Sequence, residues 1–170
     1  MSRQPGEGRY SHVEREQRWL LADLPVVATE PRQIVDYYIS GTSLRLRKIT
    51  DSTGSVFKLT QKVRAEGVSP EVVRITNMYI TESEFNSLIV LPSNALMKTR
   101  YRLTIDGCTF AIDKFGGRHI GLVLAELELA MDEPRVDSPF TAVCEVTDDD
   151  AYSGGALALA ADEEIRRILP

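Results

Sequence analysis

Charged and apolar residues alternate one by one along several short segments of this chain. In residues 43–50, Leu44 and Leu46 alternate with Arg45 and Arg47. Side chains two positions apart share one face of a β-strand, so each segment has a charged face and an apolar face. A period of two residues is typical of strands and not of helices. The pattern therefore predicts a chain that is mostly β.

Turn signals separate these segments from one another. Asp106-Gly107 and Gly116-Gly117 are dipeptides typical of hairpins, and residues 51–54 mark another turn. The expected strands span residues 12–21, 33–39, 43–50, 55–63, 71–80, 96–105, 109–115 and 119–130. Eight short antiparallel strands are enough to close a small barrel. The predicted fold class is α+β and mostly β, a closed eight-stranded antiparallel barrel with a few outer helices that cover its apolar outer face.

Two or three helices are expected beside the strands. Thr81 followed by Glu84 has the pattern of a capping box, and the apolar residues after it predict a helix over 81–90. Residues 156–168 are rich in Ala, Leu, Glu and Arg and predict a C-terminal helix, after an irregular segment. The 170 residues have the length of one domain. We expect this domain to span residues 12–170, with residues 1–11 disordered.

Composition and charge narrow the possible functions. No apolar run approaches the roughly 20 residues of a membrane-spanning helix, and residues 1–17 are too polar for a secretory signal. Cys108 and Cys144 form neither a C-x-x-C pair nor a zinc set, so we expect a reducing, cytoplasmic location. The net charge of −5, with no basic block, argues against duplex nucleic acid as a partner. The oligomeric state stays open, a homodimer included.

Each charged face keeps one sign over most of its length. Acidic pairs lie at 14/16 and 126/128, and basic pairs lie at 45/47, 58/62 and 98/100. Solvated faces normally mix signs, because neighbouring like charges repel. A barrel with a polar interior explains all five strands together, although a solvated outer face explains any one of them. Carboxylates hold Mg²⁺ or Mn²⁺ and basic side chains bind phosphate oxygens, so the interior is predicted to bind a metal-complexed polyanion.

These residues resemble the motifs of the CYTH domain, or triphosphate tunnel metalloenzyme, superfamily. The acid-x-acid-x-Lys signature of its first strand matches E-R-E-Q-R at residues 14–18. Further matches follow in the order of the family, at residues 38–39, 44–47, 59–62, 98–101, 121–128, 145–148 and 152–153. The resemblance runs from about residue 12 to residue 160. It implies an eight-stranded antiparallel tunnel with divalent-metal chemistry on triphosphates.

The resemblance also implies a role for each charged position. The implied metal ligands are Glu14, Glu16, Glu126 and Glu128. The implied phosphate-binding residues are Arg18, Arg45, Arg47, Lys58, Lys62 and Arg74. Lys98 and Arg100 are the catalytic candidates, and Lys98 would activate water if burial among cations lowers its pKa enough. Asp113 and Asp148 are weaker candidates.

Two departures from the family pattern bear on activity. Arg18 stands where the family has a lysine, which keeps the charge but replaces an ammonium with a planar fork. The family's mid-chain R-x-E-x-E strand corresponds to residues 74–78, so Thr76 and Met78 replace both acids. If Arg74 faces the interior, as its phosphate-binding role requires, both of these side chains face it too. In the alternative register Met78 lies on the outer face, under the helix at 81–90. Their loss predicts one metal in place of two, or binding without catalysis.

The leading functional hypothesis is metal-dependent hydrolysis of a triphosphate. The substrate would be inorganic tripolyphosphate, a nucleoside triphosphate or thiamine triphosphate, and the inorganic compound is the default because no aromatic-lined base pocket stands out. An adenylyl cyclase that makes cyclic AMP is the runner-up, since some members of the family catalyse that reaction. A non-catalytic polyphosphate- or triphosphate-binding module is the alternative from a different class. The simplest interpretation is a β-barrel protein that binds other proteins and carries its charged strand faces on the outside of the barrel.

Overall fold

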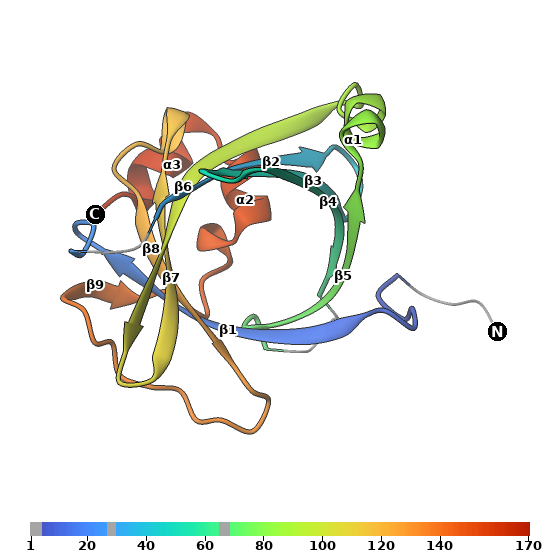
Figure 1. Cartoon of the computed structure of the whole chain (residues 1–170). Coiled ribbons are helices and arrows are strands. Elements are labelled where there is room, and N and C mark those ends of the chain that lie inside the picture. The colour runs from blue at the N-terminus through green and yellow to red at the C-terminus, as the bar shows by residue number, and fades with distance from the viewer. Residues whose placement is uncertain (1–4, 27–29, 65–68) are drawn as a thin grey trace.

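The barrel strands form one sheet that closes on itself (Figure 1). The computed structural model describes residues 5–26, 30–64 and 69–170. The strands are β1 (His12–Leu21), β2 (Arg32–Ile39), β3 (Leu44–Asp51), β4 (Gly54–Val63), β5 (Val72–Ile80), β6 (Ser93–Ile105), β7 (Cys108–Phe115) and β8 (Val123–Leu129). Their order is β5-β4-β3-β2-β6-β7-β8-β1, and the first half of β1 also pairs with β5. The predicted closed, eight-stranded antiparallel barrel is confirmed.

Short helices and a ninth strand complete the described part of the chain. They are α1 (Glu82–Leu88), the 3-10 helix η1 (Gly117–His119), β9 (Ala142–Glu145), the 3-10 helix η2 (Asp150–Tyr152), α2 (Gly154–Leu159) and α3 (Asp162–Ile168). β9 pairs antiparallel with the second half of β1. Nowhere in the described residues is a helix long and apolar enough to cross a membrane.

The structure differs from the sequence prediction mainly after residue 116. The strand expected at 119 begins only at Val123, because Gly117 and Gly121 adopt positive φ angles of 61° and 102° around η1. The helix expected over 156–168 is two helices, since the chain leaves the helical conformation at Ala160, where ψ is 136°. β9 lies in a segment expected to be irregular.

The N-terminal segment that we predicted to be disordered, residues 1–11, is described only in part. Residues 1–4 lie outside the described residues. Residues 5–11 form turns next to β4, where the N–H of Gly6 donates to Oε1 of Gln61 at 3.3 Å. The domain boundary at residue 12 stays a prediction.

The outer face of the barrel is apolar and is covered by two different kinds of segment. α1 lies against β2, β3 and β4, and the ring of Phe85 lies 5.0 Å from Phe57 and 6.0 Å from Tyr37. The outer face of β1, β7 and β8 is covered by an extended segment, whose Phe140 ring lies 5.1 Å from Phe110. The expectation that helices cover the whole outer face is therefore wrong for this wall.

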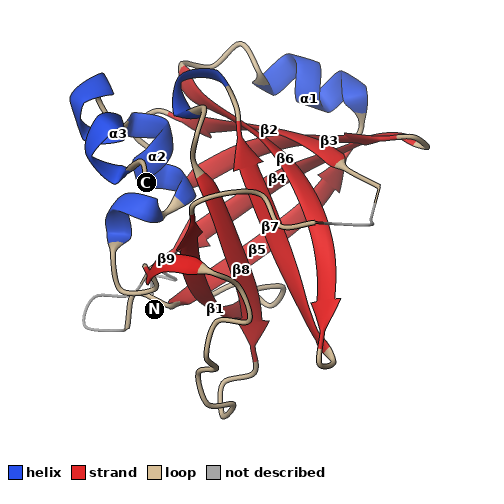
Figure 2. Cartoon of the chain, turned by 90° about the vertical axis from the view of Figure 1, so that its left-hand side faces the viewer, coloured by secondary structure: helices blue, strands red, loops and turns tan. Residues whose placement is uncertain are grey.

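α2 and α3 pack together against one end of the barrel (Figure 2). Leu157 of α2 is fully buried in a cluster with Leu96 and Leu124, which lie near the ends of β6 and β8. Tyr152 of η2 belongs to the same cluster. The apolar side chains at this end are thereby covered, while most side chains that line the rest of the interior are polar or charged.

Thr81 caps α1, as the sequence predicted. Its hydroxyl accepts a hydrogen bond from the N–H of Glu84 at 3.2 Å, and the Glu84 carboxylate accepts from the N–H of Thr81 at 2.7 Å. We expect Thr81→Ala to lower the free energy of unfolding by about 1 kcal/mol, measured by chemical denaturation. Thr81→Ser keeps the hydroxyl and should stay close to the wild type. An equal loss in both variants would contradict the capping role.

Candidate functional site

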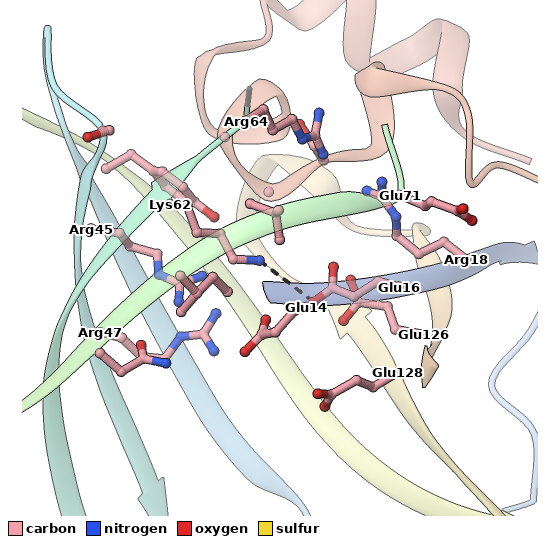
Figure 3. A pocket seen from close by; sticks show the side chains of 18 of the residues that line it. Glu14, Glu16, Arg18, Arg45, Arg47, Lys62, Arg64, Glu71, Glu126 and Glu128 are labelled. Atoms are coloured by element: carbon pink, nitrogen blue, oxygen red, sulfur yellow. Dashed lines mark ion pairs between the residues drawn. The ribbon is translucent and has the colours of Figure 1, made fainter. Parts of the chain in front are cut away.

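Inward-facing side chains of the barrel strands line a cavity of about 450 Å³. Basic side chains of β3 and β4 face acidic side chains of β1 and β8 across it (Figure 3). All but one of the predicted site residues line this cavity, namely Glu14, Glu16, Arg18, Arg45, Arg47, Lys58, Lys62, Lys98, Arg100, Glu126 and Glu128. The structure therefore brings them together, and their chemical roles stay predictions.

The acidic wall results from the register between β1 and β8. Glu16 lies opposite Glu128, and Arg18 lies opposite Glu126. Glu14 is two residues before Glu16 and so points to the same side of β1. An imidazole nitrogen of His12 lies 3.0 Å from Oε1 of Glu14. Three glutamates and one arginine from two neighbouring strands thus occupy one sector, with Glu14 beside them.

A fully buried carboxylate stands behind the two arginines of β3. Asp36 of β2 lies opposite Arg47 in the strand register. Nε and Nη2 of Arg47 donate to the two carboxylate oxygens at 2.6 and 2.8 Å, and Nε of Arg45 lies 3.5 Å from Oδ1. Although burial raises the pKa of Asp36, the charges of Arg45 and Arg47 outweigh burial and hold it well below its usual range. Asp36 is therefore ionised and neutralises part of the basic wall.

The same arrangement recurs behind the basic pair of β6. Asp113 of β7 lies opposite Arg100, whose Nε and Nη2 both donate to it at 2.6 Å. Nζ of Lys98 donates to the same carboxylate, and Nη2 of Arg100 also donates to Glu126 at 2.6 Å. Burial lowers the pKa of Lys98, and the charge of Asp113 opposes that shift. Burial and the fixed charge of Asp113 thus act in opposite directions on the pKa of Lys98.

Some residues of this site were missing from the sequence prediction. Asp36 was not predicted, although a lone charge within the apolar strand segment 33–39 was the available signal. Asp113 was only a weak candidate. Arg64 lines the cavity too; it directly follows β4, and its spacing of two residues from Lys62 was a usable signal. Asp148 lies outside the cavity, where it accepts from Arg135 at 2.7 Å.

Two buried guanidinium nitrogens have no hydrogen-bond partner in the described structure, Nε of Arg18 and Nε of Arg45. Both arginines line the cavity and are only 3% and 7% exposed. The terminal nitrogens of Arg18 donate to the carbonyl oxygens of Thr147 and Tyr152 at 3.4 and 3.2 Å. Nε of Arg45 does contact Oδ1 of Asp36, at 3.5 Å. Buried donors are normally satisfied, so the free Nε–H of Arg18 points to an acceptor that binds in the cavity.

The orientation that we expected for residues 74–78 of β5 is wrong. Val73, Ile75 and Asn77 line the cavity, whereas Arg74 and Met78 are exposed on the outer face. Thr76 alternates with the inward residues and therefore points away from the cavity as well.

The partner strands set this orientation of β5. Arg74 pairs with Val13 of β1 and with Val63 of β4. The neighbours of these two valines, Glu14 and Lys62, face inward, so Arg74 must face outward. Arg74 is therefore not placed to bind phosphate, and the described β5 wall supplies no carboxylate to the cavity.

A divalent cation in this cavity would depend on the glutamates of β1 and β8. Carboxylate oxygens are the ligands that Mg²⁺ and Mn²⁺ prefer. Among the residues that the structure describes, no three acidic, His or Cys side chains converge into a ligand group. Glu126 is paired with Arg100 at 2.6 Å, and Glu16 is paired with Lys62 at 3.7 Å. Since Mg²⁺ usually binds through one or two carboxylates together with water and substrate phosphate, the donor set fits a cation that arrives with phosphate.

Comparison with known proteins identifies the fold. No family model matches the chain, and no curated protein matches it. The chain is similar to the crystal structure of the inorganic triphosphatase NE1496, with a TM-score of 0.59 and 25% identity over 87% of this chain and 95% of that one. The PH1819 protein from Pyrococcus horikoshii OT3 has a TM-score of 0.52 and 19% identity over 71% and 79% of the two chains. A putative adenylate cyclase (bh2851) from Bacillus halodurans has a TM-score of 0.51 and 12% identity over 72% and 83%. The chain has the triphosphate tunnel fold, as its resemblance to the CYTH superfamily implied.

The orientation of β5 leads to different expected effects on stability for substitutions on its two faces. Met78 is 52% exposed, so Met78→Glu should change the free energy of unfolding by less than about 0.5 kcal/mol. Ile75 is 2% exposed, so Ile75→Ala removes buried apolar groups and should lower that free energy by about 2 kcal/mol or more. Chemical denaturation of both variants measures the difference. A larger loss in Met78→Glu than in Ile75→Ala would restore the orientation that the sequence predicted.

Acid should destabilise the protein because its interior carboxylates are ionised. The positive charge of Lys62, aided by Arg18 and Arg100, outweighs burial and lowers the pKa of Glu16 from 4.5 to about 2. A carboxylate with a depressed pKa stabilises the fold above its unfolded pKa, and that stabilisation is lost as the pH falls through the folded pKa. We therefore expect the free energy of unfolding to fall as the pH is lowered from about 4.5 to about 2.

Urea denaturation at a series of pH values measures this dependence. Glu16→Gln should have a shallower slope in that window than the wild type, because it removes one of the groups that bind a proton on unfolding. Equal slopes for the two proteins would contradict the depressed pKa of Glu16.

Proposed function

We propose that this chain hydrolyses a triphosphate in its tunnel with the help of Mg²⁺ or Mn²⁺. The observation that carries the proposal is a single cavity in which eight basic side chains face four glutamates of β1 and β8. One of the basic side chains, Arg18, presents a buried Nε–H group that has no acceptor among the described residues. The similarity to the inorganic triphosphatase NE1496 over 87% of the chain supports the same class of reaction.

The basic wall suits a chain of phosphate groups. Phosphoryl transfer depends mainly on positioning and on neutralising the charge of the phosphate oxygens. Arg45 and Arg47 would bind non-bridging oxygens through their planar guanidinium groups. Lys62 and Lys58 would add single charges along β4. The substrate would thereby be held in an extended form between the two walls.

The acidic wall and Lys98 would supply the remaining chemistry. Glu14, Glu16, Glu126 and Glu128 are the residues that would hold the divalent cation, which neutralises phosphate charge when bound. Water would attack the terminal phosphorus while the anhydride bond breaks and diphosphate leaves. Lys98 would accept the proton of the water as the neutral amine, the form that burial favours by lowering its pKa, and Arg100 would bind the developing charge.

Inorganic tripolyphosphate is the substrate that the cavity suits best. Tyr38 is the one aromatic side chain among the described residues that line the cavity. Its ring lies 5.9 Å from the guanidinium carbon of Arg45, and no second ring among the described cavity residues could enclose a base together with it. A nucleoside triphosphate would therefore bind mainly through its phosphates. The expectations of a small-molecule partner and of a cytoplasmic location stay predictions.

A non-catalytic triphosphate-binding module is the second candidate. The observation that favours it is the β5 wall, where Val73, Ile75 and Asn77 supply no metal ligand of the carboxylate type. Such a protein would bind tripolyphosphate through the basic wall and would not release phosphate. No feature of this cavity specifically favours an adenylyl cyclase. That activity is therefore considered only as a possible result of the assay below.

A phosphate-release assay tests the proposed function. Tripolyphosphate, ATP and thiamine triphosphate are each incubated with Mg²⁺, with Mn²⁺ or with EDTA, and we expect metal-dependent turnover of tripolyphosphate. Arg45→Ala should raise KM by about tenfold or more, because it removes a charged phosphate contact. Glu126→Gln should abolish most turnover and raise the metal concentration required, with a nearly normal melting temperature. Arg74→Ala, which removes an exposed arginine outside the cavity, is the matched control.

Each other outcome identifies a different function. Tight binding of tripolyphosphate without phosphate release would support the binding module. Cyclic AMP formed from ATP would support a cyclase. Wild-type turnover in both Arg45→Ala and Glu126→Gln would show that the reaction does not take place in this tunnel.

A further inference from the structure

Two buried aspartates take no direct part in the proposed chemistry. Asp36 and Asp113 are both 0% exposed, and neither is among the residues that line the cavity. A substrate in the cavity therefore does not contact them. Burying a carboxylate is costly unless it is paired and hydrogen-bonded, so each must be matched by nearby cations.

The two aspartates occupy equivalent places in neighbouring strand pairs. Asp36 lies opposite Arg47 across β2 and β3, and Asp113 lies opposite Arg100 across β7 and β6. In both cases Nε and Nη2 of the arginine donate to the carboxylate, at distances between 2.6 and 2.8 Å. The guanidinium is thereby held along the edge that Nε and Nη2 share, and its opposite edge stays available to a ligand.

Each aspartate also contacts a second cation two residues away on the same strand as its arginine. Nε of Arg45 lies 3.5 Å from Oδ1 of Asp36, and Nζ of Lys98 donates to Oδ2 of Asp113. Two cations on one face of a strand repel each other, and a carboxylate between them removes that repulsion. Each aspartate therefore holds a pair of cations and not a single one.

Arg100 has two acidic partners that differ in their access to the cavity. The side chain of Asp113 is 0% exposed, whereas the side chain of Glu126 is 19% exposed and lines the cavity. A phosphate oxygen entering the cavity can replace Glu126 as an acceptor for Arg100. It cannot replace Asp113, which lies behind the guanidinium. The bonds to Asp113 thus remain when substrate is bound.

We propose that Asp36 and Asp113 are positioning residues. Asp36 holds Arg45 and Arg47 in place for phosphate oxygens, and Asp113 holds Arg100 for phosphate and Lys98 beside the reacting water. The proposal rests on the proposed function, since it concerns the same cavity. Long basic side chains lose rotamer freedom when they bind a ligand, and prior immobilisation removes that cost from binding. The Asp36 pair should act mainly on substrate affinity. The Asp113 pair contains Lys98 and should act mainly on the chemical step.

Isosteric substitutions separate these two effects. We expect Asp36→Asn to weaken tripolyphosphate binding by about tenfold, the size of a strong coupling between neighbouring charged groups. Calorimetry in EDTA measures that affinity without turnover. Asp113→Asn should lower kcat by about tenfold with a smaller change in KM. Asp51→Asn is the matched control, because Asp51 pairs with Arg32 at 3.6 Å at the barrel surface and outside the cavity.

A charge-balanced double variant keeps the proposal testable even if the single Asn variants are unstable. Asp36→Asn leaves buried cations without their counter-charge, whereas Asp36→Asn/Arg47→Gln restores the balance. If Asp36 acts through its arginines, the loss of tripolyphosphate affinity in the double variant should be well below the product of the two single losses. Asp36→Asn also raises the positive charge of the basic wall, so tighter binding of tripolyphosphate by this variant would show that Asp36 is only a counter-charge and would overturn the proposal. Losses that simply multiply, or wild-type affinity and kinetics in both Asn variants, would overturn it too.

A readout that needs no substrate distinguishes this proposal from the proposed function. Side-chain nitrogen NMR reports how fast the guanidinium groups of Arg47 and Arg100 rotate. Rotation should be slow in the wild type and in Asp51→Asn, and faster for Arg47 in Asp36→Asn and for Arg100 in Asp113→Asn. A protein that neither binds nor hydrolyses tripolyphosphate but passes this test would refute the function and keep the positioning role. Unchanged rotation in both Asn variants would refute the positioning role itself.

Discussion

Charge compensation inside the barrel is the constraint on which the rest of the structure depends. Eight basic side chains line one cavity, and their mutual repulsion would open the barrel without matching anions. Cross-strand aspartates and glutamates supply those anions at hydrogen-bonding distance. A buried ion pair is tolerated only when its geometry is good and its remaining lone pairs and protons are satisfied. The bidentate bonds of Asp36 and Asp113 meet that condition, and they leave the cavity side of the cations open.

A polar interior reverses the usual placement of the apolar residues and therefore makes the outer layer essential. The apolar faces of β1, β7 and β8 would be exposed without the extended segment that contains Phe140. Glu71 helps to hold this segment, because its carboxylate accepts from Nε of Arg15 and from Nε of Arg135, each at 2.9 Å. α2 and α3 cover the apolar side chains at one end in the same way. The C-terminal third of the chain is thus part of the barrel's stability and not an appendage.

Strand faces and tight turns were predictable because both depend on neighbours in sequence. Asp106 and Gly107 both have positive φ, 49° and 83°, which is the hairpin conformation that their residue types predict. The alternation in β3 placed Arg45 and Arg47 on one face and Leu46 on the other, as observed. Asp36 could not be assigned in this way, since its meaning depends on Arg47 in another strand.

By itself, the sequence determined which residues share a face of each strand, and hence the composition of the charged and apolar faces. It did not determine which face points inward where neither carries a clear signal. On β5 one face has Val73, Ile75 and Asn77, and the other has Arg74, Thr76 and Met78, so the pattern alone is ambiguous. Only the tertiary structure decided this, because pairing with β1 and β4 sets the orientation of β5. Pairing across strands also decided which carboxylate neutralises which cation, since those partners are distant in sequence and meet only when the barrel closes.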